Sequence, residues 1–391
     1  MKHSYFRSLI FLLLAANFFL LLSQAHAIPA FARRNKISCM TCHAPFPRLK
    51  PYGEEFAANA MILKESEKER DYITAGDDML WLNKEFPLAV RFDAFAVNES
   101  KNPVARDIQS PWGIKLLSGG ALYKNIGYYF YFYMAEAGEV AGIEDAYIHF
   151  DNVLGTNLDV MVGQFQTSDP LMKRELRLTY EDYQIYKATV VASRINLTYD
   201  RGVMLLYSID KTSTDLVGMV VNGNGKVEAG FDEKFDRDDF KNVGLRLSQS
   251  IGELLSVGGF YYTGKEYINS GTPENKVTYL GPDVSFSYGS IEITAQYLER
   301  KDENSVLSHP LEYKTKGIVC EMVISPRLDR SRICLTALYN KIDSDAPNLD
   351  YHTATLSGTY LLARNMRLVG EYRRDLEEKA NRFVIGMVTG F

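Results

Sequence analysis

The feature that most constrains the fold is an alternation of apolar and polar side chains that recurs from residue 86 to the end of the chain. In one stretch, Ile291, Ile293 and Ala295 alternate with Glu292 and Thr294. Successive side chains of a β-strand point to opposite faces, so a period of two predicts strands with one apolar and one polar face. The sequence therefore predicts a mainly β fold.

Such segments are about sixteen in number, with 14–18 as the range that uncertain boundaries allow. They cover residues 87–98, 112–122, 127–138, 143–152, 157–165, 193–207, 214–223, 240–250, 253–263, 275–287, 290–299, 312–324, 331–341, 351–362, 366–375 and 381–391. Connections after even-numbered segments are mostly short, whereas several after odd-numbered segments are long and polar, including 99–111, 166–192 and 224–239. Short turns on one rim and long loops on the other are typical of a transmembrane antiparallel β-barrel, and a sandwich or propeller has no reason to sort them so.

Two further features agree with a barrel in the bacterial outer membrane, in contact with membrane lipid. The chain ends on Phe391, which resembles the C-terminal aromatic by which such barrels are recognised for assembly. The 25 Tyr and 21 Phe suit aromatic girdles at membrane interfaces. The net charge of −5 gives no indication of nucleic acid as a partner.

The long segment 166–192, rich in charged residues, is expected to fold into the lumen as a constriction, with an exposed loop as the alternative.

The chain before the barrel divides into two parts. Residues 1–27 have a basic start, an apolar run over 9–22 and Ala25-His26-Ala27, which together predict a secretory signal peptide. Residues 28–85 form a separate segment, followed by the barrel over 86–391. Three prolines over 45–51 forbid a regular helix there, and a helix is predicted from Tyr52 to about Ile62.

The segment 28–85 contains one chemical motif, Cys39-Met40-Thr41-Cys42-His43. Two thiols three residues apart, followed by an imidazole, are what covalent attachment of a c-type haem requires. Cys39 and Cys42 would form the thioethers, and His43 would be the proximal ligand of the iron. A zinc site would need two more ligands close by, and a thioredoxin-like site would need a βαβ setting. We therefore predict one haem c, on a small, mainly α or irregular segment.

The sixth ligand of the iron is left open by the sequence. Met61 lies on the inward face of the predicted helix and is a candidate distal ligand, with plain core packing as the alternative. His149 and His352 lie on predicted strands, and ordinary polar positions in the lumen are the alternative for both. The charge around the motif is locally positive and could pair with haem propionates, attract an acidic electron-transfer partner, or serve solubility. The basic residues concerned are Arg33, Arg34, Lys36, Arg48 and Lys50.

The residues around the motif resemble the N-terminal segment of a family of exported monohaem c-type cytochromes. The resemblance rests on Phe31-Ala32-Arg33, Phe46-Pro47, Leu49, Gly53-Glu54, Phe56 and Asn59 around the motif, and on Gly163-Gln164-Phe165-Gln166, Ser168-Asp169-Pro170 and Lys173-Arg174-Glu175-Leu176. In that family the CxxCH motif precedes a long β-rich region, in metal-respiring and related bacteria. The resemblance implies electron transfer and an outer-membrane location, and it implies no particular substrate.

Two more cysteines, Cys320 and Cys334, lie on consecutive predicted strands around a turn at 326–330. An exported chain meets an oxidising compartment, so a cross-strand disulfide is predicted, with two reduced thiols as the alternative.

Three functions fit the sequence. The first is electron transfer by a haem on the periplasmic side of the barrel, with periplasmic or outer-membrane cytochromes as redox partners, which makes the chain an electron carrier rather than an enzyme. The second is a porin-like channel in which the haem segment is a plug or sensor. The third is a haem peroxidase.

Overall fold

The structure is a computed structural model that describes residues 30–35, 37–62, 79, 86–236, 238–268, 274–304 and 311–391. The predicted signal peptide and most of the link between residues 63 and 85 lie outside the described residues. No helix among the described residues is long and apolar enough to cross a bilayer.

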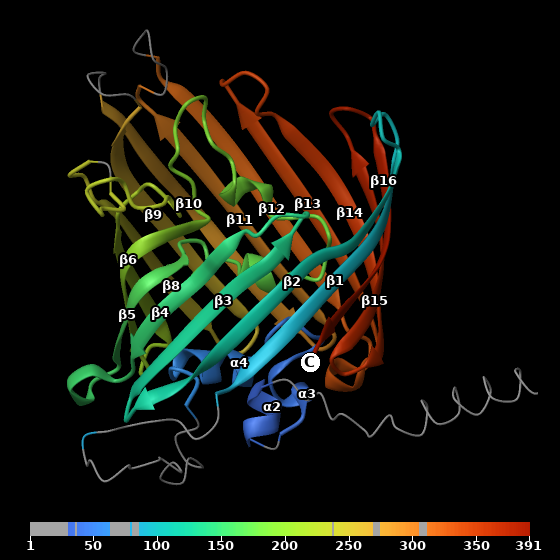
Figure 1. Cartoon of the computed structure of the whole chain (residues 1–391), viewed down its shortest axis with the longest axis horizontal. Coiled ribbons are helices and arrows are strands. Elements are labelled where there is room, and N and C mark those ends of the chain that lie inside the picture. The colour runs from blue at the N-terminus through green and yellow to red at the C-terminus, as the bar shows by residue number, and fades with distance from the viewer. Residues whose placement is uncertain are drawn as a thin grey trace, which may run out of the picture.

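Sixteen antiparallel strands form a closed barrel, in which each strand pairs with its neighbours in the chain and β1 pairs with β16 (Figure 1). The strands are β1 (Leu88–Glu99), β2 (Arg106–Tyr123), β3 (Ile126–Glu136), β4 (Gly142–Phe150), β5 (Leu158–Gln166), β6 (Tyr199–Ile209), β7 (Thr214–Val221), β8 (Asn242–Ile251), β9 (Leu255–Tyr267), β10 (Glu274–Tyr288), β11 (Ile291–Asp302), β12 (Tyr313–Ile324), β13 (Ile333–Ser344), β14 (Tyr351–Ala363), β15 (Met366–Asp375) and β16 (Asn381–Gly390). The predicted fold class and the predicted strand number are confirmed.

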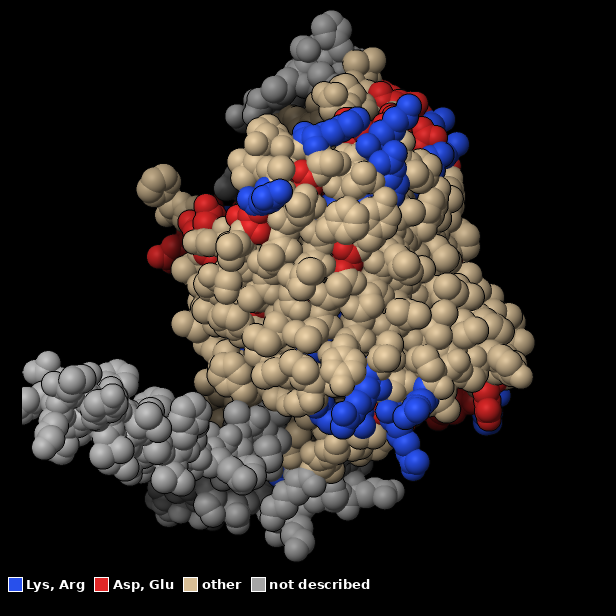
Figure 2. Space-filling model, turned by 90° about the vertical axis from the view of Figure 1, so that its right-hand side faces the viewer, with Lys and Arg blue, Asp and Glu red and all other residues tan. Residues whose placement is uncertain are grey.

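The outer face of the wall is mainly apolar. The inner face is mainly polar, with apolar side chains such as Val319 where the inner loop packs on it. On β14, Thr353, Thr355 and Ser357 are buried in the lumen, whereas Leu356 between them is 59% exposed. Figure 2 shows charged side chains gathered at the upper and lower ends of the barrel, with a band between them that is almost free of charge. An apolar outer band between two charged rims is the surface that a membrane requires of a barrel.

The connections are sorted as the sequence predicts. One rim carries the turns after even-numbered strands, for example Arg364 and Asn365 between β14 and β15, and we call it the short-turn rim. The largest differences between predicted and observed strands are the first residues of β2 and β6. β2 begins at Arg106, because its residues pair with β1 as far as Asn98. β6 begins only at Tyr199, because the preceding residues leave the wall and enter the lumen.

In the described part of the chain before the barrel there are three helices: α2 (Ala30–Asn35), α3 (Cys39–Cys42) and α4 (Pro51–Ala58). Pro51 stands at the start of α4, where its fixed φ suits a helix and its missing N–H costs nothing. The predicted helix is shorter than expected, because Ala60 and Met61 take left-handed φ values of 54° and 59° and the chain turns away. Short 3₁₀ helices occur at Val153–Gly155, Arg174–Leu176, Gln184–Tyr186 and Leu328–Arg330. Figure 1 shows α2, α3 and α4 together at the short-turn rim.

The predicted disulfide between Cys320 and Cys334 is wrong. Cys320 pairs with Tyr339 across β12 and β13, which is five positions along β13 from Cys334. At about 3.3 Å per residue the two cysteines are roughly 16 Å apart along the strands, and Cys334 faces inward whereas Cys320 faces outward. Both thiols are free. The error came from the turn, whose centre lies nearer to Cys334 than the sequence suggested.

Candidate haem site in the barrel mouth

The two cysteines of the motif lie on the single turn of α3. Residues three apart on a helix face the same side, so Cys39 and Cys42 are placed for one ligand. The Ser38 hydroxyl caps the turn by accepting a bond from the amide of Met40, at 3.3 Å, and the amide of His43 donates to the carbonyl of Cys39, at 2.9 Å. Neither thiol is in a disulfide, and burial raises the pKa of both, so they are held as neutral thiols.

The imidazole of His43 is oriented by the backbone that follows it. Its Nδ1 lies 2.8 Å from the carbonyl oxygen of Pro47 and 3.2 Å from that of Arg48. A carbonyl can only accept, so Nδ1 carries the proton and the lone pair is on Nε2. Burial lowers the pKa of His43, which keeps the ring neutral. A neutral imidazole whose second nitrogen is tied to a backbone carbonyl is the usual state of a metal-ligating histidine.

A cavity lies beside Cys39 and the imidazole of His43. Its lining includes Cys39, His43 and Phe46 from the segment, and Ser325, Leu361 and Arg364 from the barrel. Its volume is about 10 Å³, so the side chains that line it have to give way where a porphyrin binds. The donors fit a c-type haem in kind. The thiol of Cys39, the imidazole of His43 and the cationic side chain of Arg364 line this cavity, and Cys42 lies on the same helical turn as Cys39.

Ion pairs fasten the segment to the barrel. Arg48 donates to Glu321 on β12 at 3.0 Å and also to Glu292 on β11. Burial disfavours the charge of Arg48, but the two carboxylates outweigh that effect and raise its pKa. Lys50 binds Asp329 in the turn after β12. The positive charges near the motif are thus used, in part, to hold the segment in the mouth of the barrel.

Glycines of the wall give the segment room on its other side. A Cβ atom added at Gly127 of β3 would overlap the backbone of Ala60, and one added at Gly119 of β2 would overlap the sulfur of Met61. Phe46 packs against Gly390 of β16 in the same way. The segment 30–62 therefore reaches strands on several sides of the lumen.

The candidates for the sixth ligand are dispersed. Met61 faces β2, and the described residues that line the cavity beside His43 do not include it. Its role as a distal ligand stays a prediction. His149 is buried in the lumen, 3.7 Å from Asp159, on the strand position paired with Gly127. His352 is bonded to Tyr339, at 2.9 Å, on the outward side of the wall, which takes it away from the lumen.

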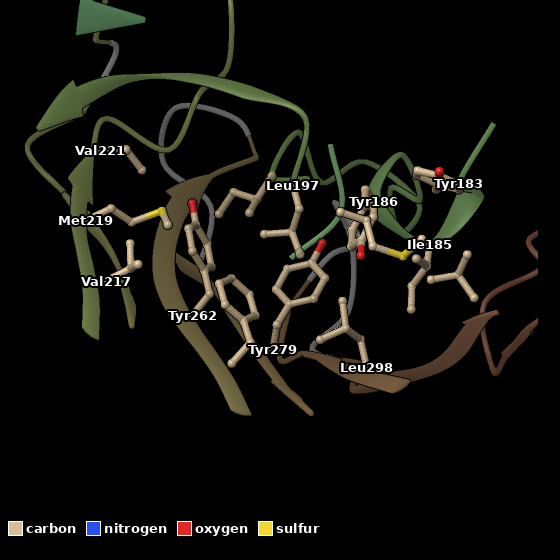
Figure 3. Close-up of a cluster of buried hydrophobic side chains, with 14 of the residues drawn as sticks. Tyr183, Ile185, Tyr186, Leu197, Val217, Met219, Val221, Tyr262, Tyr279 and Leu298 are labelled. Carbon is tan, nitrogen blue, oxygen red and sulfur yellow. The ribbon is translucent and has the colours of Figure 1, made fainter. Parts of the chain in front are cut away.

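Residues 167–198, which we call the inner loop, fill much of the lumen between β5 and β6. Arg300 of β11 donates to the carbonyls of Ala188 and Ile195, both at 2.8 Å, and Glu371 of β15 accepts from the amide of Tyr180, at 2.7 Å. Figure 3 shows Tyr186, Leu197 and their neighbours packed on apolar side chains of the wall such as Tyr262. Lys173 reaches Glu54 of α4, so the inner loop also touches the segment that carries the CxxCH motif. The predicted folding of this segment into the lumen is confirmed.

Sequence reasoning missed the wall residues that receive the segment: Glu292, Glu321, Gly119 and Gly127. The two carboxylates occupy polar positions of the alternation, and that is the only signal they leave. Their partner Arg48 is 273 residues from Glu321, and no local pattern encodes a pairing over that distance.

No family model and no curated relative matches the chain. Solved structures of outer-membrane proteins do match it. A loop-deletion mutant of the outer membrane protein OmpT from Vibrio cholerae has a TM-score of 0.56 at 15% identity, over 78% of this chain and 99% of that one. An anion-selective porin from Comamonas acidovorans has a TM-score of 0.57 at 11% identity, over 78% and 99%. OmpF from Salmonella typhi, in complex with daunomycin, has a TM-score of 0.57 at 10% identity, over 78% and 97%.

Identities this low show the fold alone. The chain has the porin-like, sixteen-stranded β-barrel fold of bacterial outer-membrane proteins, with a small helical segment in its mouth. The predicted location in the outer membrane agrees with this fold and with the band almost free of charge on the face that Figure 2 shows.

Proposed function

We propose that the chain is an outer-membrane electron carrier that holds one haem c at the periplasmic mouth of its barrel. Cys39 and Cys42 form the thioethers, and Nε2 of His43 is the proximal ligand. The observation that carries the proposal is the state of His43. Its Nδ1 is bound by the carbonyls of Pro47 and Arg48, next to two free thiols on one helical turn.

When bound, the haem supplies one-electron chemistry by cycling of its iron between Fe(III) and Fe(II). The residues around it supply position and charge. The Pro47 carbonyl fixes the plane and tautomer of the imidazole, and Phe46 packs edge-on against that ring, with 5.4 Å between the ring centroids. Arg364, which lines the cavity beside the motif, offers a positive charge to a propionate.

The partners we propose are periplasmic or outer-membrane cytochromes. One haem at one rim leaves most of the roughly 30 Å of hydrocarbon to be crossed by another carrier. The ion pairs of Arg48 and Lys50 with the wall keep the segment at a fixed place on the rim, where a second protein can meet it.

Denaturing mass spectrometry of the mature protein tests the attachment. The expected result is a mass increase of one haem, which Cys39→Ala combined with Cys42→Ala abolishes. The matched control is Cys320→Ala combined with Cys334→Ala, which removes two thiols outside the motif and keeps the haem. Attachment that survives loss of Cys39 and Cys42, or no attachment in the unaltered chain, would contradict the proposal.

A second candidate is a porin-like channel in which residues 28–85 act as a plug. The observation in its favour is that the described part of this segment is bound to β11 and β12 on one side and packed on β2 and β3 on the other. Planar-bilayer conductance of the full chain and of a chain lacking residues 28–85 separates the two. A large rise on deletion favours the plug, and equal conductance leaves electron transfer as the function of the segment.

A further inference from the structure

A second cavity lies in the lumen, between the inner loop and the wall. It has a volume of about 30 Å³. Strands β1, β2, β3 and β15 form one side of it, and residues 177–180 of the inner loop form the other. It shares no lining residue with the cavity beside His43.

Four of the residues that line this cavity are basic and two are acidic. The basic ones are Arg91, Lys115, Arg177 and Arg367, and the acidic ones are Asp93 and Glu136. Arg91 binds Asp93 at 2.8 Å, and Lys115 binds Glu175, just behind the lining, at 3.1 Å. Arg177 lies 3.7 Å from Asp182, which also binds Arg174 and Lys187. When these neighbours are included, six basic groups face four acidic ones, and two positive charges are left over.

The excess positive charge is concentrated on Arg367, whose side chain is buried with 2% of its surface exposed. Its Nη1 donates to the carbonyl of Leu178, at 2.9 Å. Among the described residues, no carboxylate lies within ion-pair distance of it, and its buried Nε has no hydrogen-bond partner. Asp93, in the same cavity, acts on Arg367 only from beyond ion-pair distance, and Arg91 and Lys115 already bind it. A buried guanidinium with no carboxylate in contact is unfavourable, so this position favours a further anion.

The remaining wall of the cavity sets the size of that anion. Phe95 and Tyr180 pack edge-on with 4.9 Å between their ring centroids, and Trp112 packs against Tyr180 at 5.6 Å. These rings exclude water from one side, which strengthens electrostatic attraction on the other. The volume of about 30 Å³ suits a small ion without movement of the lining.

We propose that this cavity is a binding site for one small oxyanion, held by Arg367, Arg177, Arg91 and Lys115. Inorganic phosphate, nitrate and the carboxylate of a short organic acid share the required chemistry: a negative charge and two or more oxygens for the guanidinium forks. The site does not depend on the haem, and it goes beyond electron transfer by giving the lumen a bound ligand of its own.

The test is the thermal transition of the full-length barrel in detergent, with phosphate, nitrate or acetate added at constant ionic strength. The transition temperature of the wild-type protein is expected to rise and saturate with at least one of the three anions. The anion that acts at the lowest concentration is the one that the site prefers. Arg367→Met is expected to lower the affinity for that anion about tenfold or more, because a charge-assisted bond is lost. In the absence of the anion the variant should be at least as stable as the wild type, because it lacks the unpaired charge.

The matched control is Arg373→Met, on the same strand and also facing inward. Arg373 donates to Glu99 at 2.6 Å and lies 3.6 Å from Glu181, so it has the counter-ions that Arg367 lacks. This variant should lose stability with or without the anion and keep the anion response. No saturable response in the wild type, or an equal response in Arg367→Met, would overturn the proposal.

Discussion

The wall of the barrel and the material inside it are held by different forces. In the wall, each strand pairs with its neighbour in the chain, as β14 does with β15 over a turn of two residues. Inside, the haem segment and the inner loop contain little regular structure, and side chains tie them to strands far away in sequence. Arg300 holds carbonyls of the inner loop that are 105 and 112 residues away.

This difference teaches where single substitutions can act. Loss of one outward side chain leaves the backbone ladder of the wall in place. The interior depends on a few buried groups that each make several bonds, so it can be released while the wall stays folded.

Gly127→Val should expel the haem segment from the barrel. A side chain at this position overlaps the backbone of Ala60, which cannot yield as a flexible side chain would. Trypsin should then cleave after Arg48, whose ion pairs otherwise protect it, and mass spectrometry of the fragments reports the cleavage. Gly370→Val on β15 is the control, because an added Cβ there meets nothing within 4 Å. Equal protection of Arg48 in both variants would show that the segment does not depend on this contact.

Arg300→Met should release the inner loop. Arg300 is 2% exposed and binds two loop carbonyls, Ser193 and Asp302, so its loss leaves several buried groups without partners. The expected cost is about 3–5 kcal/mol. Hydrogen exchange at the amide of Leu197, which donates to Tyr186, should accelerate by about two to three powers of ten. Lys301→Met, one residue on and exposed, is the control and should leave this exchange rate unchanged.

Asp169→Asn should stabilise the protein at alkaline pH. Burial in the inner loop raises the pKa of Asp169 to about 7, with Lys173 opposing the rise. In the unfolded chain the carboxyl ionises near pH 4. The wild type therefore loses stability as the pH rises from about 4 to 7, because the folded state must keep a proton that the unfolded state releases.

The variant lacks this loss. Its free energy of unfolding should exceed that of the wild type by about 4 kcal/mol at pH 8 and match it at pH 4, as measured by chemical unfolding. Asp343→Asn, on an exposed side chain, is the control and should shift neither value. A difference that is the same at both pH values would mean that the effect is not due to ionisation.

The smallest effect is expected from reducing agents. Because Cys320 and Cys334 face opposite sides of the wall, dithiothreitol should leave the thermal transition where it is. A lower transition temperature in dithiothreitol would show that Cys320 and Cys334 do form a disulfide. The register of β12 against β13 would then have to be different.

The wall could be predicted from the sequence because its determinants are local. Alternation assigns faces, and a short turn sets the register of the two strands it joins. This reasoning located all sixteen strands, and it failed where a turn was misjudged, as at Leu328–Arg330 between the two cysteines. It also assigned residues 193–198 to the strand that begins at Tyr199. These six residues belong to the inner loop, and their apolar side chains resemble the start of a strand.

The candidate site was predictable only in part. Cys39, Cys42 and His43 follow from a five-residue motif, and the motif fixes their roles without any structure. The groups that orient and anchor them do not follow, because the carbonyls of Pro47 and Arg48 carry no sequence signal. Glu321 resembles any other polar residue of the lumen until the segment is seen to bind it.

The central claim is that the motif in the barrel mouth carries a haem, and one measurement tests it most directly. The protein is purified from outer membranes, and its visible spectrum is recorded before and after reduction with dithionite. The account predicts the sharp α-band of a reduced c-type cytochrome, which remains with the protein after denaturation and extraction with acidic acetone. The absence of an α-band, or a band that the extraction removes, would contradict the account.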